Sequence, residues 1–162
     1  MDNLNFKFNY KIPYLTANDK KKYFEKASLS IRKRFPLIIH KKGDEFNQVF
    51  NFILRESYMQ PHMHPASKMI EKMHLISGSF KLIIFRDNGE PLKVYNVDKN
   101  NNRIAVPSFT WHTYVMTSKK TIVFETMEGV YDPKTWKKIP AWAPEESNIK
   151  AKEYYENLKK IY

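Results

Sequence analysis

Short runs in which apolar and polar residues alternate fill the middle of the chain and predict β-strands. The runs span residues 46–54, 69–76, 80–86, 92–97, 103–106, 113–116 and 121–127. A further strand is expected around His62 and His64, and Asp87-Asn88-Gly89-Glu90 predicts a hairpin turn between two of the runs. Many short strands at even spacing favour a mainly β fold, in the form of a double-sheet jelly roll.

Helical patterns are predicted on both sides of the strands. Asn18 is a suitable N-cap for a helix over residues 18–35, which Pro36 would end. The apolar face of this helix consists of Tyr23, Phe24, Ala27 and Ile31. A second helix is predicted over residues 144–161, because Pro144 and the two glutamates after it suit a first helical turn and lysines suit the last.

Residues 1–17 are predicted to form an extended, aromatic arm. Its rings are placed mostly at every second position, like those of an added strand: Phe6, Phe8, Tyr10 and Tyr14. Such a segment is costly to leave in water and can pair with a sheet edge. We predict a homodimer to whose interface the arm contributes; the alternative is that the arm covers the barrel of its own chain.

The chain has 162 residues and no cysteine. This length suits a single domain over residues 1–162, with the strands forming a barrel over residues 37–140. The absence of cysteine excludes disulfides and thiolate metal ligands. No apolar run in the sequence resembles a signal peptide or reaches membrane-spanning length, so we expect a cytoplasmic protein without a membrane span.

The formal net charge of the chain is +11, and most of the positive charge is lysine. The lysines occur as pairs and triplets spread along the sequence, and no nucleic-acid-binding motif accompanies them, which argues against nucleic acid as the partner. The abundance of lysine, asparagine and isoleucine also fits an AT-rich genome. A functional use of the charge would be an anionic small substrate, such as a nucleotide sugar.

Three of the five histidines fall in two short stretches, His62-Met63-His64 and the end of Pro107-Ser108-Phe109-Thr110-Trp111-His112. On a strand, a spacing of two turns both imidazoles of the first stretch to the same face. Glu71 follows, and His112 would approach from a second pair of strands. Three neutral imidazoles and one carboxylate suit one divalent transition metal per chain, namely Fe, Mn, Ni, Co or Zn.

The spacing of these residues resembles the two motifs of the cupin superfamily. His62-x-His64, Glu71 and Gly78 are similar to the first motif, with six residues in each of the two gaps. Pro107-x-Phe109-x-x-His112 is similar to the second, although Phe109 stands where glycine is usual and must make the turn without glycine's tolerance of positive φ. The gap between His64 and Glu71 is longer than the usual cupin spacing.

A closer resemblance is to the WbuC-type family of cupin-fold metalloproteins, which are encoded among genes for O-antigen and related polysaccharides. The stretches that carry it are residues 27–40, 124–131 and 141–146, in addition to the two histidine motifs. The resemblance implies a cupin double-stranded β-helix, flanked by an N-terminal and a C-terminal helix, with a metal held by His62, His64, Glu71 and His112.

Counting in steps of two from the proposed ligands predicts which residues share the interior with the metal. Tyr58 falls on the face of His62, and Tyr114 falls on the face of His112. These tyrosines would orient substrate or move protons, or would simply fill the barrel. Glu125 alternates with the apolar Val123 and Met127. If this face is inward, burial would raise the pKa of Glu125 and make it a candidate base; the alternative is a structural pairing with an arginine such as Arg55 or Arg86.

Two other histidines have structural interpretations. His74 should lie on the face opposite Glu71, outside the barrel. His40 follows an apolar run and is expected either at the mouth of the site or as a hydrogen-bonded core residue.

Three functions fit these features. The first is an enzyme acting on a sugar-derived or nucleotide-sugar ligand in surface-polysaccharide biosynthesis, with the metal as Lewis acid for an isomerisation, epimerisation or elimination. In it, Tyr58, Tyr114 or Glu125 would move a proton. The second is a metal-dependent dioxygenase. The third is a non-enzymatic module that binds a small molecule through its metal.

Overall fold

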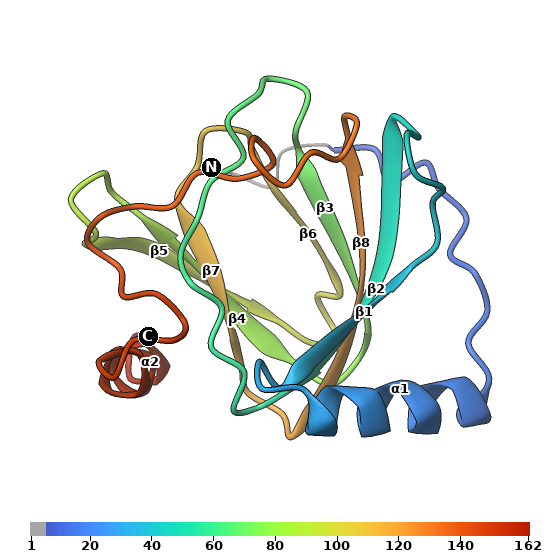
Figure 1. Ribbon diagram of the computed structural model, residues 1–162, viewed down its shortest axis with the longest axis horizontal. Coiled ribbons are helices and arrows are strands. Elements are labelled where there is room, and N and C mark those ends of the chain that lie inside the picture. Colours follow the sequence, from blue (N-terminus) through green and yellow to red (C-terminus); the bar gives the residue numbers. More distant parts are fainter. Residues whose placement is uncertain (1–5) are drawn as a thin grey trace.

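The computed structural model describes residues 6–162 (Figure 1), which form eight strands and two helices. The helices are α1 (Ala17–Leu29) and α2 (Ala151–Lys159). The strands are β1 (Arg34–Ile38), β2 (Phe46–Leu54), β3 (Glu71–Ser77), β4 (Phe80–Phe85), β5 (Pro91–Val97), β6 (Arg103–Val106), β7 (His112–Met116) and β8 (Lys120–Glu128).

The strands make two antiparallel sheets that face each other, as Figure 1 shows. Within the described residues, one sheet has the strand order β1-β2-β8-β3-β6 and the other β5-β4-β7. The longest pairing joins β2 to β8 over their full lengths, from Phe46 opposite Glu128 to Leu54 opposite Lys120. A mainly β jelly roll flanked by a helix on each side of the barrel sequence is confirmed.

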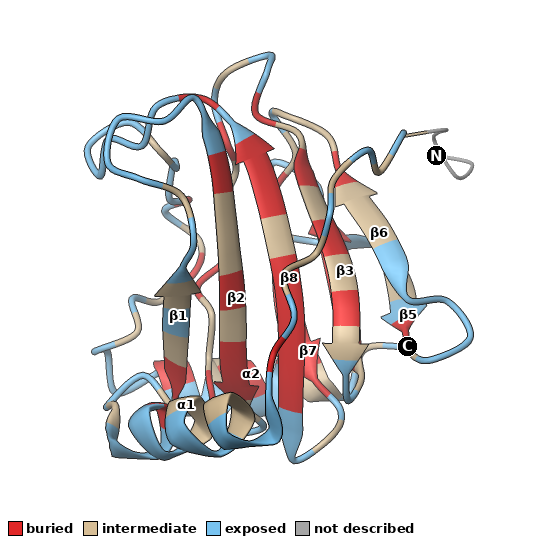
Figure 2. Ribbon diagram, turned by 90° about the vertical axis from the view of Figure 1, so that its right-hand side faces the viewer, coloured by how far each residue is buried: buried red, intermediate tan, exposed pale blue. Residues whose placement is uncertain are grey.

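Three buried clusters hold the two sheets and the helices together. The first lies between the sheets and includes Met73, Leu82 and Met116. The second covers the outer face of the larger sheet, where α1 packs, and the third covers the outer face of the smaller sheet, where α2 packs. Both faces of β4 are therefore covered, which explains why every residue of this strand is buried. Figure 2 shows similarly continuous burial along most of β8.

Helix α1 begins and ends earlier than the predicted range of 18–35. Thr16, not Asn18, is the N-cap: its Oγ1 accepts from the Asp19 amide at 3.0 Å, and its own amide donates to the Asp19 carboxylate at 2.9 Å. The helix ends at Leu29, and Ile31 is 96% exposed. Pro36 does not end a helix but lies in β1, an edge strand on which a missing amide hydrogen is tolerated.

The second helix was predicted to start at Pro144, but α2 starts at Ala151. Contacts with the barrel hold the intervening segment out of a helix. The Tyr58 hydroxyl donates to the carbonyl of Pro144 at 2.8 Å, and Glu146 forms ion pairs with Arg32 and Arg34. Tertiary contacts have overridden the capping pattern here.

The described part of the arm packs on its own chain. The Tyr10 ring lies 5.6 Å from the Phe124 ring of β8, and Lys72 donates to the carbonyl of Lys7 at 2.9 Å. Tyr14 remains 87% exposed. Residues 1–5 of the predicted arm lie outside the described residues. Between residues 6 and 162, neither helix is long and apolar enough to cross a membrane.

Candidate metal centre

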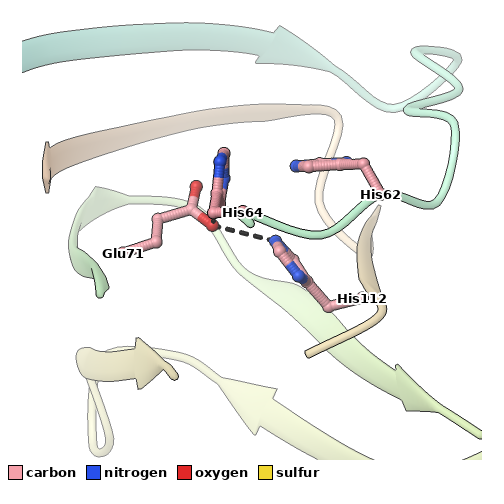
Figure 3. Close-up of side chains that lie close together, drawn as sticks. All are labelled: His62, His64, Glu71 and His112. Atoms are coloured by element: carbon pink, nitrogen blue, oxygen red, sulfur yellow. Dashed lines mark hydrogen bonds and ion pairs between the residues drawn. The ribbon is translucent and has the colours of Figure 1, made fainter. Parts of the chain in front are cut away.

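Four buried side chains meet between the two sheets, as Figure 3 shows: those of His62, His64, Glu71 and His112. Glu71 is the first residue of β3 in the larger sheet, and His112 is the first residue of β7 in the smaller one. One candidate ligand atom from each residue lies within 4.8 Å of the other three. The structure therefore brings together the four residues that the two motifs indicated.

The segment that carries His62 and His64 is not a regular strand, contrary to the prediction. It is held by two isolated β-bridges, one from His62 to His112 and one from Met63 to Lys138. The amide of His62 donates to the carbonyl of His112 at 3.0 Å, and the reverse bond is 2.9 Å long. Met63 makes the corresponding pair with Lys138. Pro61 has no amide hydrogen with which to extend this ladder.

The turn before His112 is made without glycine. Phe109 adopts a φ of 58°, in the left-handed region, and its amide donates to the carbonyl of His64 at 2.9 Å. This conformation costs a residue with a Cβ roughly 1–2 kcal/mol. The hydrogen bond that it makes ties the second motif to the first.

Each of the three histidines has its Nδ1 beside a backbone carbonyl. His62 contacts the carbonyl of Gln60 at 3.0 Å, His64 that of Trp136 at 2.8 Å, and His112 that of Thr110 at 2.8 Å. A carbonyl oxygen only accepts hydrogen bonds, so each Nδ1 carries a proton, and Nε2 is the atom that offers a lone pair to a metal when it is unprotonated. This orientation of the imidazole ring is typical of histidines that bind metals.

Glu71 lies among these Nε2 atoms. Its Oε2 is 2.9 Å from Nε2 of His112 and 3.6 Å from Nε2 of His64. Burial alone would raise the pKa of Glu71, but its contacts with His112 and His64 outweigh burial and hold the pKa well below its usual value. Burial lowers the pKa of His62 well below its usual value. Burial would lower the pKa of His64, but its contacts with Glu71 outweigh burial and raise it. An ionised Glu71 and a neutral His62 are in the states that bind a metal, and a metal would displace any proton held between Glu71 and its two neighbouring histidines.

The residues present fit a divalent transition metal. The Nε2 atom of His64 is buried and has no hydrogen-bond partner among the described residues, which is unusual unless a ligand completes it. Three imidazole nitrogens and one carboxylate oxygen suit several first-row divalent ions equally, so the identity of the metal does not follow from the ligands.

A cavity of about 320 Å³ is lined by three of the four residues, His62, His64 and Glu71. Tyr114 lines it, with its ring 5.6 Å from that of His112, and its buried hydroxyl has no hydrogen-bond partner within residues 6–162. Burial, reinforced by Glu71, raises the pKa of Tyr114 well above its usual value.

Glu125 also lines the cavity, so the face that the sequence left open is inward. The hydrogen-bond partner of Glu125 is neither Arg55 nor Arg86. Instead, the side-chain amide of Asn51 donates to the Glu125 carboxylate at 2.9 Å. Burial and the neighbouring Glu71 raise the pKa of Glu125 well above its usual value. The cavity therefore has two acidic side chains whose pKa values shift in opposite directions.

Tyr58 does not reach this cavity. Its ring packs against Tyr154 and Tyr155, and it lines a separate groove beside α2. Counting in steps of two from His62 fails because residues 58–64 are not a regular strand.

The two remaining histidines lie where the sequence placed them or close to it. His74 is on the opposite face from Glu71, with its Nε2 3.5 Å from the side-chain amide of Asn102. His40 lines the cavity and accepts a hydrogen bond at 3.0 Å from the backbone amide of Gln48, but it is only partly buried, so it lies at the site and not in the core.

Sequence reasoning missed Asn51, Trp136 and Lys137, which also line the cavity. Asn51 could have been found, because it occupies a polar position between the apolar Val49 and Ile53 on a predicted strand. Trp136 and Lys137 belong to an irregular segment after β8, where no periodicity indicates direction.

The fold is a cupin-type jelly roll, and its buried cluster of three histidines and one glutamate could hold a metal ion. Residues 15–97 match the family described as "Domain of unknown function (DUF6016)", about half of the chain, and the chain belongs to this family. No curated protein matches it.

Solved structures share the fold at low sequence identity. Protein SO0799 from Shewanella oneidensis is 11% identical at a TM-score of 0.57, with 78% of this chain and 85% of that one covered. The capsular polysaccharide assembling protein CapF from Staphylococcus aureus is 14% identical at a TM-score of 0.50, over 65% of this chain. CapF bound to the inhibitor 3-isopropenyl-tropolone gives 14% identity and a TM-score of 0.53. The chain spans about a third of CapF, 32% and 34% in the two structures.

Proposed function

We propose that this protein is a metal-dependent enzyme that acts on a small, sugar-derived ligand in surface-polysaccharide biosynthesis. The observation that carries the proposal is the orientation of the three histidines. Each is held through Nδ1 by a backbone carbonyl, so that the Nε2 atoms meet Glu71 beside a cavity with two further titratable side chains. A divalent metal held by these residues would supply Lewis-acid stabilisation of a substrate oxygen.

The polysaccharide context rests on two likenesses. The motifs around His62, His64 and His112 resemble those of the WbuC-type family, whose genes lie among those for O-antigen synthesis. One protein with a similar fold is described as assembling capsular polysaccharide. These two likenesses support a role in polysaccharide biosynthesis. The residues of the site support a metal-dependent reaction.

Tyr114 and Glu125 are the residues we propose to move protons. Both line the cavity together with the ligand cluster, and the Tyr114 hydroxyl has no partner within the described residues. Asn51 holds one oxygen of the Glu125 carboxylate and thereby orients the group. A proton shuttled between carbon and one of these groups is common to isomerisation, epimerisation and elimination.

Solvent-deuterium exchange tests this reaction class. The protein as isolated is incubated in D₂O with a panel of nucleotide sugars, and substrate C–H signals are followed by NMR. We expect exchange at one carbon, its loss in Tyr114→Phe and Glu125→Gln, and its retention in the controls Tyr58→Phe and Glu128→Gln. Oxygen consumption without exchange would favour the dioxygenase, and tight binding with neither would favour the binding module.

We also propose that the chain forms a homodimer. Within residues 6–162 the edges of both sheets have no partner strand, and Tyr14 is largely exposed. Light scattering at micromolar concentration should report twice the chain mass, and deletion of residues 1–15 should weaken the dimer. A monomer at high concentration would contradict the proposal and leave the arm covering only its own barrel.

A further inference from the structure

Lys137 is a cation that lines the cavity beside the metal ligands. It belongs to the segment that follows β8, which Figure 1 shows crossing the end of the barrel toward α2. No sequence pattern marks Lys137 as a site residue, because it is one of two adjacent lysines in an irregular stretch.

The backbone on both sides of Lys137 is tied to the histidine segment. The carbonyl of Trp136 accepts from Nδ1 of His64 at 2.8 Å. On the other side, Lys138 exchanges backbone hydrogen bonds of 2.8 and 3.0 Å with Met63. Lys137 lines the cavity whereas Lys138 does not, as expected when neighbouring residues of an extended segment point in opposite directions. The backbone position of Lys137 relative to the ligand cluster is therefore fixed by the same contacts that hold His62 and His64, while the residue itself is exposed at the cavity.

The other charged groups of the cavity already have partners. Arg32 donates to both carboxylate oxygens of Glu146, at 2.7 and 3.1 Å, and the buried Arg34 also pairs with Glu146. Glu71 contacts His112, and Glu125 accepts from Asn51. Lys137 makes no hydrogen bond or ion pair with any residue from 6 to 162. It is thus a cation that remains available to a bound molecule.

We propose that Lys137 binds the anionic group, a carboxylate or a phosphate, of the small ligand that occupies this cavity. The inference rests on the proposed function in one respect, that the cavity beside the metal ligands is the substrate site. A charge-assisted hydrogen bond from lysine recognises either oxyanion.

The size and the remaining polar atoms of the cavity narrow the ligand further. A volume of about 320 Å³ is at the lower end of the range for small-molecule sites, which suits a group of monosaccharide size better than a whole nucleotide sugar. Asn47 and Tyr114 also line the cavity, and the Oδ1 atom of Asn47 and the hydroxyl of Tyr114 are buried without partners among the described residues. They complement hydroxyl groups on a ligand. The substrate class is therefore an acidic or phosphorylated sugar.

Calorimetric titration of the protein as isolated tests the role of Lys137, with glucuronate, inorganic phosphate and neutral glucose as the three probes. We expect at least one anion to bind more tightly than glucose. Lys137→Met should weaken that anion about tenfold or more, and change glucose binding by less than about twofold, because only the charged contact is lost. The matched control Lys138→Met should leave all three unchanged. The stronger of the two anions identifies the carboxylate or the phosphate as the recognised group.

Two results would overturn the inference: no anion binding to the wild-type protein, or anion binding that Lys137→Met weakens no more than Lys138→Met does. Metal content measured on the same samples separates this from the proposed function. Anion binding that depends on Lys137 in a protein that binds no metal would uphold the inference and refute the metal-dependent enzyme. If the wild type contains metal but its anion binding does not depend on Lys137, the inference is refuted while the proposed function stands.

Discussion

Strands β2 and β8 lie side by side in the larger sheet, and the side chains on their two faces differ in polarity. The outer face is aromatic and aliphatic: Phe50 and Phe124 are fully buried with their rings 4.7 Å apart, in the cluster that α1 and the arm cover. The inner face toward the cavity is mixed, because apolar residues flank a polar pair in which Asn51 is hydrogen-bonded to Glu125 across the same two strands.

This difference shows how one pair of strands serves two purposes. Successive side chains of a strand point to opposite faces, so Phe124 and Glu125 are neighbours in sequence but occupy different environments. The outer residues stabilise the sheet against α1, and the inner residues line the cavity. Changes on one face should therefore affect stability, and changes on the other should affect the site.

The largest effect is expected on the outer face. Phe124→Ala removes a fully buried ring and should lower the free energy of unfolding by about 3–5 kcal/mol, measured by denaturant titration. Metal content of the folded fraction should not change. The neighbouring Glu125→Gln should cost less than about 1 kcal/mol, because its amide preserves the shape of the side chain. A folded Phe124→Ala protein that has lost its metal would contradict the separation of the two faces.

Acid should weaken the contact that ties the segment before α2 to the barrel. Burial raises the pKa of Glu146, but its hydrogen bonds with Arg32 and Arg34 outweigh this, and the net shift is downward. A carboxyl with a lowered pKa stabilises the fold above its ordinary pKa, and the contribution is lost as pH falls through the lowered value.

In protein stripped of metal by a chelator, Glu146→Gln should therefore lower the free energy of unfolding by roughly 1–3 kcal/mol at neutral pH. The difference from wild type should shrink as the pH falls below about 4.5, the ordinary range of a glutamate. Glu145→Gln, at an exposed position beside it, is the control and should have little effect at any pH. A difference that grows on acidification would show that the sign of the Glu146 shift is wrong.

On the inner face, Glu71→Gln should weaken metal binding on the order of tenfold, because it removes the negative charge among the three Nε2 atoms. Competition with a chromophoric chelator measures the affinity. Unchanged affinity with lost activity would make Glu71 a proton-transfer or substrate-binding group, and no effect on either would make it structural.

Much of the fold could be predicted from the sequence, because alternation determines which residues of a strand are buried. Residues 46–54 and 103–106 form strands with the predicted limits, and Tyr114 faces the interior as counted. The four candidate ligands could be recognised from the spacing of the two histidine motifs, even though His62 and His64 do not lie on a regular strand.

The errors arose where contacts between distant residues override local preference. The ion pairs of Glu146 keep residues 144–150 out of the predicted helix, and a bridge to Lys138 replaces the predicted strand at Met63. Tyr58 was misplaced because the alternation was carried through Pro61, where no regular strand exists. No local pattern could bring Lys137 to the cavity, since its position depends on hydrogen bonds to the histidine segment.

The smallest effect is expected at the turn before His112. Phe109 has a φ of 58° and is 59% exposed, so Phe109→Gly relieves backbone strain with little loss of packing. The greater freedom of glycine in the unfolded chain offsets part of this, and we expect a gain of at most about 1 kcal/mol. Thermal unfolding should show a midpoint higher by roughly 2–4 °C. Phe46→Gly, at the start of β2, should instead lower the midpoint, and a lower midpoint for both would show that Phe109 is not strained.

The central claim, that His62 and His64 help to hold a metal, is tested most directly by elemental analysis of the purified protein. The wild type should contain about one divalent transition metal per chain, and the His62→Ala, His64→Ala double variant should contain none, because two of the four converging ligands are gone. His74→Ala, on the opposite face of β3, should keep the wild-type content. Metal that persists in the folded double variant, or a wild type that takes up none, would contradict the account.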